Sequence, residues 1–488
     1  MEHASQDTSP PSPANKPLAR GTLWAYGLPG LALAMPTLPA VLYLPSLYAV
    51  ELGLGFAVVG LCLFLARGLD VITDPIIGVI SDRLRSRFGR RKPVIVLGAI
   101  IGAPAMLLLF SPPDEAGALG WPYLLTCTAL LYLGWTMISI PYTAWGAELS
   151  PDYQERSKVT GIREGCTLAG LLLAGCLPVI GSEIGLTERG GITLLAVAAV
   201  VLGGLTITWL LMRVPEKSLV SQRRPARAEQ TLFSKKGWRT VSGNKPFLRL
   251  FSAWVINGLA GGIPATLLVL YLDHVLLAST TQKGLLIFAY FLAGAACIPV
   301  WLAVAKRIGK HRCWCLAMTI TVLAFMWVPF LEPGDIWLFA LICVVTGSSL
   351  GADLALPPAM QADVIDLDRL RSGERREGLF FAMWGMGQKL SYALAAGLAL
   401  GALELFGFSA EAAANGTASP EALSALAWLY GGSPIVLKGI AILLVWGHPL
   451  DARAQGILQR RLARRAERSR FRLPMANGPE AAALRPAE

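Results

Sequence analysis

Long apolar segments recur along the whole chain, and they constrain its fold more than any other feature of the sequence. About 20 predominantly apolar residues suffice for a helix to cross the hydrocarbon core of a membrane. Twelve segments of this kind are predicted, at 23–50, 54–81, 93–111, 119–147, 158–182, 191–212, 247–275, 281–305, 312–331, 336–362, 376–406 and 424–447. Only 15% of the residues are charged, whereas soluble domains average about 25%. We therefore expect an all-α polytopic membrane protein.

The charged residues between these segments are distributed asymmetrically. Basic residues outnumber acidic ones by six to one in 82–93, by ten to two in 213–249 and by nine to four in 451–488. The loops that alternate with them are short and acidic, as in Asp114-Glu115. Because basic loops remain in the cytoplasm, both termini are predicted to be cytoplasmic. The net charge of +11 then reflects orientation and does not indicate a nucleic-acid partner.

Short features recur at nearly one spacing and suggest an internal repeat. Glu155-Arg156 recurs as Glu374-Arg375 and Gly89 recurs as Gly309, and the two sequence separations differ by a single position. Either two related six-helix bundles are present, or basic loops resemble each other by composition; we favour the bundles, because two independent pairs of features share nearly one offset. Transporters with such repeats bind their solute between the halves. The predicted organisation is a disordered tail (1–22), an N-terminal bundle (23–212), a basic central loop (213–246), a C-terminal bundle (247–450) and a basic tail (451–488).

Several motifs resemble those of a known transporter family. The stretch from Gly78 to Pro93, with Asp82 and a basic cluster, resembles the loop signature of the major facilitator superfamily. Four further motifs resemble the glycoside–pentoside–hexuronide:cation symporters, the melibiose permease group: Arg67-x-x-Asp70-x-x-x-Asp74-Pro75, Pro141-Tyr142-x-Ala144-Trp145-x-x-Glu148, Asp152-Tyr153-x-Glu155-Arg156 and Ala362-Asp363-Val364-Ile365-Asp366. The resemblance implies the major facilitator fold, with twelve transmembrane helices in two pseudo-symmetric six-helix bundles.

Ionisable residues inside a membrane span are costly and indicate function by default. Arg67, Asp70 and Asp74 have the i, i+3, i+7 spacing that places side chains on one helix face. Two carboxylates one turn apart can bind a cation or share a proton, although Arg67 could instead simply neutralise Asp70. In the resembled family the two aspartates belong to the cation site, together with polar residues of the fourth span, which here are Thr136 and Ser139.

The chain departs from the melibiose permease pattern at two acidic positions. The permease has an acid where Ser139 stands here, and it has a sugar-binding acid in the first span, whereas 23–50 contains no Asp or Glu. A hard cation such as sodium prefers more anionic oxygens than two carboxylates offer. The sequence therefore favours proton over sodium coupling and calls the usual galactoside recognition into question.

Lys389 lies in the eleventh span without a carboxylate one turn away. It matches a family lysine thought to communicate between the cation and sugar sites, so we expect it to pair with Asp70 or Asp74; the alternative is a side chain that extends to a polar cavity. Lys438 has no assigned role and could extend its amine to the cytoplasm. Sugar rings stack on aromatic side chains, and Trp135 is one aromatic candidate. The predicted solute-binding residues are Arg163, Lys389, Gln388, Tyr142, Trp145 and Trp384.

Charged residues of the cytoplasmic loops are predicted to form a gate, paired in the outward-open state and separated in the inward-open state; ordinary solvated loop charge is the alternative. The predicted gate residues are Arg67, Gly78, Asp82, Arg83, Arg87, Arg90, Arg91, Glu148, Glu155, Arg156, Asp363, Asp366 and Arg375.

These features together predict a secondary transporter, a proton- or sodium-coupled symporter of a sugar, glycoside or related polar solute. The alternatives are a carrier of a more apolar solute (a drug, lipid or terpenoid) and a non-transporting membrane sensor. The four scattered histidines and the lack of a Gly-x-Ser-x-Gly motif argue against an enzyme. No cofactor, no nucleic-acid partner and no metal other than a transported sodium are expected. We expect a monomer in a bacterial inner membrane.

Overall fold

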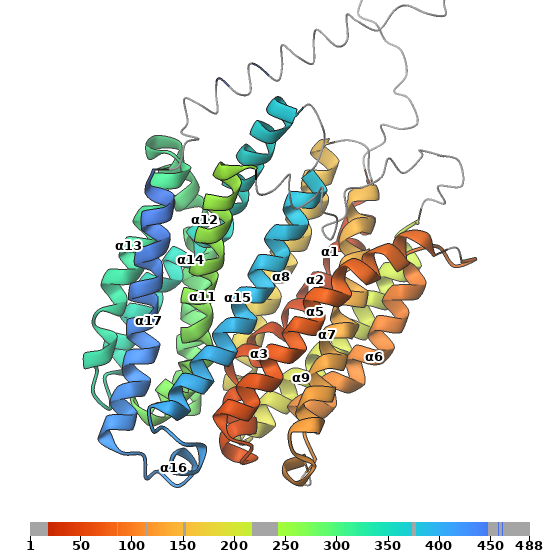
Figure 1. The fold of residues 1–488 in the computed structure, drawn as a ribbon. Helices are drawn as coiled ribbons and strands as arrows, with labels where there is room; N and C mark the ends of the chain where they lie inside the picture. The colour runs from red at the N-terminus through yellow and green to blue at the C-terminus, as the bar shows by residue number, and fades with distance from the viewer. Residues whose placement is uncertain are drawn as a thin grey trace, which may run out of the picture.

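The computed structural model describes residues 18–84, 86–113, 116–149, 153–216, 243–372 and 377–447, together with 457 and 461. Most of both predicted tails and of the central loop lies outside these residues. The described part of the chain consists of helices and turns without β-strands (Figure 1).

The first predicted span is a broken helix, made of α1 (Arg20–Gly27), α2 (Pro29–Ala34), α3 (Thr37–Leu42), α4 (Leu44–Ser46) and a π-helical turn, Leu47–Glu51. Prolines recur through this segment, as at Pro29 and Pro45. A proline lacks the N–H that a continuous helix needs and clashes with the preceding turn, so the backbone bends repeatedly. Such breaks are tolerated in a membrane helix where protein buries them.

The remaining spans are long helices. In the N-terminal half they are α5 (Phe56–Arg83), α6 (Lys92–Phe110), α7 (Ala116–Glu148), α8 (Tyr153–Glu183) and α9 (Glu188–Arg213). In the C-terminal half they are α11 (Lys245–His274), α12 (Thr280–Ile308), α13 (Lys310–Phe325, followed by a 3₁₀ turn at Val328–Phe330), α14 (Ile336–Ser372), α15 (Glu377–Leu405) and α17 (Pro420–Trp446), with the short α16 (Ala410–Ala414) between the last two.

Eleven spans in the described residues are long and apolar enough to cross a membrane. The exception among the twelve predicted segments is α15, which has 29 residues but carries Gln388, Lys389 and Ser391, and these lower its mean hydropathy. The twelve-helix prediction is therefore confirmed, since α15 has the length of a membrane span and is only less apolar than the others.

The helices pack in the same order in both halves. In the N-terminal half α8 packs on α2, α2 on α9, α9 on α6, α6 on α7 and α7 on α5; in the C-terminal half the order is α15, α11, α17, α13, α14 and α12. When the six spans of each half are numbered along the chain, both packing orders run fifth, first, sixth, third, fourth and second. This identity confirms the two pseudo-symmetric bundles. Each arc opens toward the other half, where α5 packs on α15 and α8 on α12.

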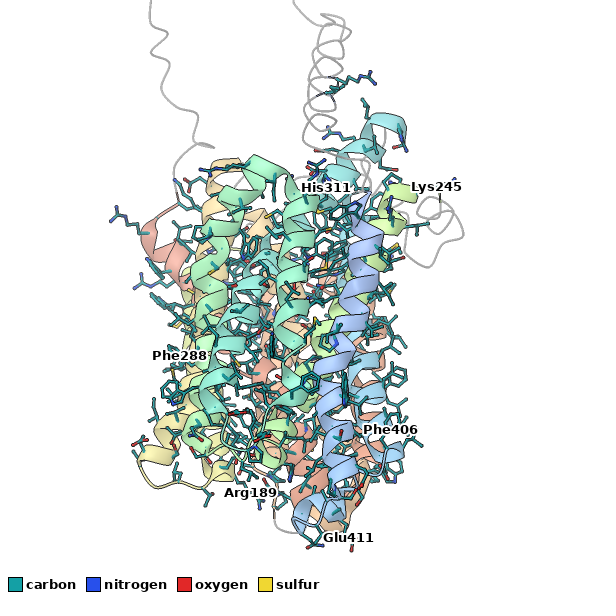
Figure 2. The ribbon with its side chains drawn as sticks, turned by 90° about the vertical axis from the view of Figure 1, so that its left-hand side faces the viewer. Arg189, Lys245, Phe288, His311, Phe406 and Glu411 are labelled. Atoms are coloured by element: carbon teal, nitrogen blue, oxygen red, sulfur yellow. The ribbon has the colours of Figure 1, made fainter. Side chains whose placement is uncertain are left out.

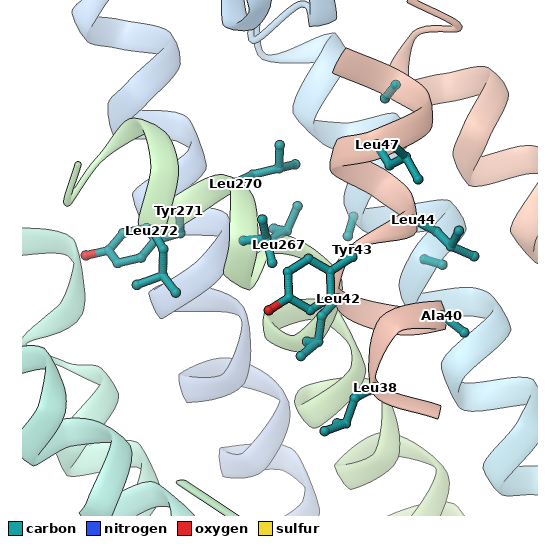
Figure 3. Close-up of a cluster of buried hydrophobic side chains, with 14 of the residues drawn as sticks. Leu38, Ala40, Leu42, Tyr43, Leu44, Leu47, Leu267, Leu270, Tyr271 and Leu272 are labelled. Atoms are coloured by element: carbon teal, nitrogen blue, oxygen red, sulfur yellow. The ribbon is translucent and has the colours of Figure 1, made fainter. Parts of the chain in front are cut away.

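We call the two ends of the molecule the basic end and the acidic end (Figure 2). The basic end carries Lys245 and His311, and the acidic end carries Glu411 and Arg189. At the acidic end one apolar core joins both halves, as Figure 3 shows for Leu38 and Tyr43 beside Leu267 and Leu270. At the basic end the apolar clusters are separate, one around Trp145 in the N-terminal half and one around Trp314 in the C-terminal half.

Polar contacts also hold the halves together at the acidic end. The Lys283 ammonium, 3% exposed, lies 2.5 Å from a Glu188 oxygen of the other half and 2.7 Å from Asp273. The Glu404 carboxylate accepts the Ala57 N–H across the same junction at 2.7 Å. The structure is therefore a conformation closed at its acidic end.

Replacing Lys283 by glutamine is expected to open the acidic end. The substitution removes charge-assisted hydrogen bonds worth about 2 kcal/mol, roughly a 30-fold change in the conformational equilibrium. Spin labels at Leu186 and Leu277, both exposed, report the separation of the two halves by double electron–electron resonance. We expect a longer distance in the variant. Arg189→Gln is the control, because Arg189 bonds Pro112 within its own half; equal distances in wild type and Lys283→Gln would contradict the prediction.

Candidate functional site

Four side chains from three helices meet between the two halves. Lys389 of α15 places its Nζ 2.7 Å from Asp74 and 2.9 Å from Asp70, both on α5. The Thr136 hydroxyl of α7 lies 2.6 Å from Asp70 Oδ1 and 2.9 Å from Asp74 Oδ1. The structure thus brings together the predicted cation-site aspartates, one of the two predicted polar residues of the fourth span, and the predicted lysine.

Helix geometry explains how α5 presents its charges. Asp70 is buried, and Arg67 approaches it at 3.8 Å one turn away. The Arg67 guanidinium lies over the Tyr132 ring at 4.1 Å and lines a small central cavity with Tyr392 of the other half. The prediction that Arg67 belongs to a gate at the basic end is wrong, since it lies next to the aspartates in the middle of α5.

The geometry of Thr136 bears on what the two carboxylates can hold. A hydroxyl has one hydrogen and can donate it to one acceptor at a time, yet two carboxylate oxygens lie within hydrogen-bonding distance of it. The second contact is favourable when the second carboxyl carries a proton, which it then donates to the hydroxyl oxygen. The pair therefore has a place for one proton once Lys389, which supplies the positive charge in this conformation, has moved away.

The net charge of the cluster is balanced. Arg67 and Lys389 contribute two positive charges, and Asp70 and Asp74 contribute two negative ones. Balance matters here because an unpaired charge in a low-dielectric interior is strongly destabilising. A cation can therefore enter the site at low cost only if a positive group leaves, and Lys389 is the group that comes from the other half of the molecule.

Two predicted members of the site stand apart from it. Ser139 lies one turn from Thr136 and is half-buried, but among the described residues it makes no hydrogen bond to Asp70 or Asp74. Gln388 is exposed, and as the residue next to Lys389 it leaves the helix in a different direction.

Arg163 and Tyr142 lie in the N-terminal half where α1, α7 and α8 meet. The Tyr142 ring stacks on Tyr26 with 4.7 Å between centroids, and each tyrosine hydroxyl donates to the other residue's carbonyl. Arg163 pairs with Glu164. Both predicted residues therefore make these contacts within the N-terminal half.

Two of the predicted aromatic platforms, Trp145 and Trp384, are buried in the bundle cores. Trp145 is 1% exposed, and its ring faces the Lys92 ammonium at 5.5 Å. Trp384 stacks on Trp254 at 4.8 Å between centroids. Trp135 lines a cavity of about 370 Å³ among α2, α6, α7 and α9, on the side of the N-terminal half away from the junction. In this conformation none of the three presents a free ring face between the halves.

Charged residues at the basic end pair within each half. Arg91 binds Asp82 at 2.7 Å and Glu148 at 2.8 Å, and Arg90 binds Glu148 at 2.7 Å. Glu216, which the sequence analysis overlooked, accepts the backbone N–H groups of Arg90 and Arg91. These pairs stabilise one loop of the N-terminal half and do not join the two halves.

The other predicted gate residues are placed as follows. Lys310 binds Asp363 at 2.7 Å within the C-terminal half, and Glu155 binds Lys158 within the N-terminal half. Gly78 makes no close helix contact, since a Cβ there would only touch Ile140 at 3.8 Å. Arg83 and Arg87 are exposed and Asp366 is half-buried. Arg375 and the Arg156 side chain lie outside the described residues.

A second buried charge cluster lies in the C-terminal half and was missed. Lys438 donates to Asn257 at 2.7 Å and lies 3.4 Å from Asp353, whose other oxygen accepts the Trp314 indole N–H at 2.6 Å. The suggestion that Lys438 extends to the cytoplasm is wrong, because its side chain is 6% exposed and satisfied inside the bundle. The signal was present in the sequence, since Asp353 is an acid inside a predicted span.

Comparisons with known proteins agree on the architecture. A model of the family described as MFS/sugar transport protein matches residues 25–452. The putative glycoside/cation symporter YagG of Escherichia coli is 25% identical and covers 90% of this chain and 94% of its own. The sodium-dependent lysophosphatidylcholine symporter 1 of Homo sapiens is 25% identical and covers 80% and 76%. The crystal structure of a D-xylose-proton symporter superposes with a TM-score of 0.61 at 15% identity, covering 88% and 98%.

Proposed function

The chain belongs to the MFS/sugar transport protein family, and from this we propose that it is a cation-coupled symporter of a small solute. We further propose that it acts as a monomer in a bacterial inner membrane, with its basic end and both termini in the cytoplasm. The observation that carries the proposal is the placement of Lys389 from one half between Asp70 and Asp74 of the other. Because this contact joins the two halves, the binding of a cation at the aspartates would change how firmly the halves are held together.

The proposed mechanism is an exchange of cations at the two aspartates. In the conformation closed at the acidic end, Lys389 neutralises Asp70 and Asp74 and ties α15 to α5. When the acidic end is open, the coupling cation enters from that side, binds these carboxylates and replaces Lys389 in the charge balance. The halves can then rock about the solute, as transporters with repeated halves do. Loss of the cation to the cytoplasm allows Lys389 to return.

We propose that the coupling ion is a proton. Support comes from the Thr136 hydroxyl, which lies within reach of both carboxylates and leaves a place for one hydrogen. Ser139, where the melibiose permease has an acid, contributes no oxygen to the site in this conformation. A sodium ion would find fewer oxygens than such hard cations usually take.

The proposed solute is a sugar, a glycoside or a related polar molecule, and a glycoside/cation symporter is among the relatives. A second candidate is an amphiphile with a long apolar part. It is favoured by the buried aromatic rings, which offer no stacking face, by the first span without acids, and by the relative named for lysophosphatidylcholine.

Uptake into proteoliposomes tests the proposed function. Radiolabelled methyl β-glucoside and lysophosphatidylcholine are offered separately under a proton gradient alone and under a sodium gradient alone. We expect accumulation of one solute above its equilibrium level with the proton gradient. Accumulation driven only by sodium would overturn the assignment of the ion, and equilibration without accumulation under either gradient would overturn symport.

A further inference from the structure

The strongest feature outside the proposed coupling site is Asp353. It lies at least four turns from both ends of α14. Other acids in the described part of the C-terminal half lie nearer to helix ends, and Asp273 and Glu404 lie in the last turns of their helices. An acid retained so deep in the membrane region carries a large desolvation cost, and the mechanism above does not use it.

The pseudo-symmetry of the two halves relates Asp353 to the coupling site. Helix α14 occupies in the C-terminal arc the place that α7 occupies in the N-terminal arc. The sequence separation between Thr136 and Asp353 is three residues shorter than the separation between Gly89 and Gly309, so Asp353 lies slightly less than one helical turn from the counterpart of Thr136. The wall of the central space that holds Thr136 in one half therefore holds Asp353 in the other.

The surroundings of Asp353 face the centre of the molecule. Its carboxylate is within electrostatic range of the phenol groups of Tyr290 on α12 and Tyr392 on α15, and both helices pack against the N-terminal half. Tyr392 also lines the small central cavity with Arg67. The Asp353 side chain keeps 19% of its surface exposed, whereas its partner Lys438 keeps 6%.

The hydrogen bonds of Asp353 fix its orientation and leave some acceptor positions of its carboxylate open. The Trp314 indole N–H donates to Asp353 Oδ1 at 2.6 Å. Lys438 makes only a long contact of 3.4 Å to Oδ2, because its shorter hydrogen bond goes to Asn257. A carboxylate has about four acceptor positions, so at least two remain open. A group that is held in place by buried donors and still has free acceptors is suited to bind a ligand.

We propose that Asp353 binds the transported solute, accepting a hydrogen bond from a hydroxyl or ammonium group, with Trp314 and Lys438 as positioning residues. This inference rests on the proposed function and assigns the polar anchor for the solute to the C-terminal half. Asp353 would then serve as the solute-binding acid that the first span lacks. The ion and the solute would then be bound on opposite walls of the same central space.

Transport kinetics of Asp353→Asn test the proposal, with the solute that the wild type accumulates, methyl β-glucoside or lysophosphatidylcholine, as the probe. Removing one hydrogen bond to a charged group should raise KM for the solute roughly 10- to 100-fold. The cation concentration for half-maximal uptake should stay within about twofold, because Asp70 and Asp74 are intact. Asp353→Glu should recover part of the affinity. Asp335→Asn, at the acidic end, is the matched control and should leave KM unchanged.

The double variant Asp353→Asn/Lys438→Met distinguishes a solute-binding role of Asp353 from a purely structural ion pair with Lys438. It leaves no unpaired buried charge, so it should fold as well as the wild type and still show the high KM of Asp353→Asn. A wild-type KM in the double variant would overturn the proposal and make the pair structural. A changed cation dependence with an unchanged KM would also overturn it, in favour of a second ion site. A wild type that accumulates neither probe would instead refute symport itself, and this inference with it.

Discussion

Replacing Asp74 by asparagine is expected to abolish accumulation of solute against its gradient. A membrane potential of 100 mV is worth about 2.3 kcal/mol per charge, so a symporter that carries one cation with a neutral solute can concentrate it about 50-fold. Asparagine keeps the shape of Asp74 but loses the charge that alternates between Lys389 and the coupling cation. The inside-to-outside ratio in energised proteoliposomes should therefore fall to about one.

The control for this prediction is an aspartate outside the site. Asp335 lies at the acidic end, where it accepts the Glu332 N–H, and Asp335→Asn should accumulate solute as the wild type does. Undiminished accumulation by Asp74→Asn would show that Asp74 does not carry the coupling ion.

Replacing Lys389 by glutamine is expected to separate ion binding from transport. Lys389 occupies the position between the carboxylates that a cation would take, at 2.7 Å and 2.9 Å from them. Without this internal competitor the coupling cation should bind at least about tenfold more tightly, because a charged hydrogen bond of this kind is worth about 1.5–3 kcal/mol. The bound cation should also be released slowly, since no side chain returns to displace it, and accumulation should fall strongly.

For the proposed proton, a pH titration of the purified variant that follows its carboxyl groups measures this affinity. Arg163→Gln is a suitable comparison, because Arg163 is another intramembrane cation but pairs with Glu164 and not with the aspartates; its affinity for the cation should match the wild type. Equal or weaker cation binding by Lys389→Gln would contradict the exchange mechanism.

The contact between Lys389 and the aspartates illustrates what sequence can predict. Asp70 and Asp74 share a helix face by their spacing, and Lys389 is a charge in an apolar span that must find a partner. Both observations are local, and the pairing follows from charge balance. Thr136 was predicted from the resemblance to the symporter family, but its position within reach of both carboxylates is a property of the packed helices.

Other features depended on contacts that no local pattern reveals. The rings of Trp145 and Trp384 were attractive as sugar platforms, yet packing places both in bundle cores. Arg67 was grouped with the basic loop although helix rise places it several turns from the end of α5. The partners of Lys438 come from α11 and α14, and only the arrangement of the whole C-terminal half brings them together.

Counterflow and accumulation measured in the same Asp74→Asn proteoliposomes test the central claim most directly. Counterflow exchanges labelled for unlabelled solute and needs the rocking motion but no ion gradient. If Asp70 and Asp74 carry the coupling ion, Asp74→Asn retains counterflow while its accumulation ratio falls to one. Loss of counterflow together with accumulation in a folded variant, or retention of both, would contradict the claim.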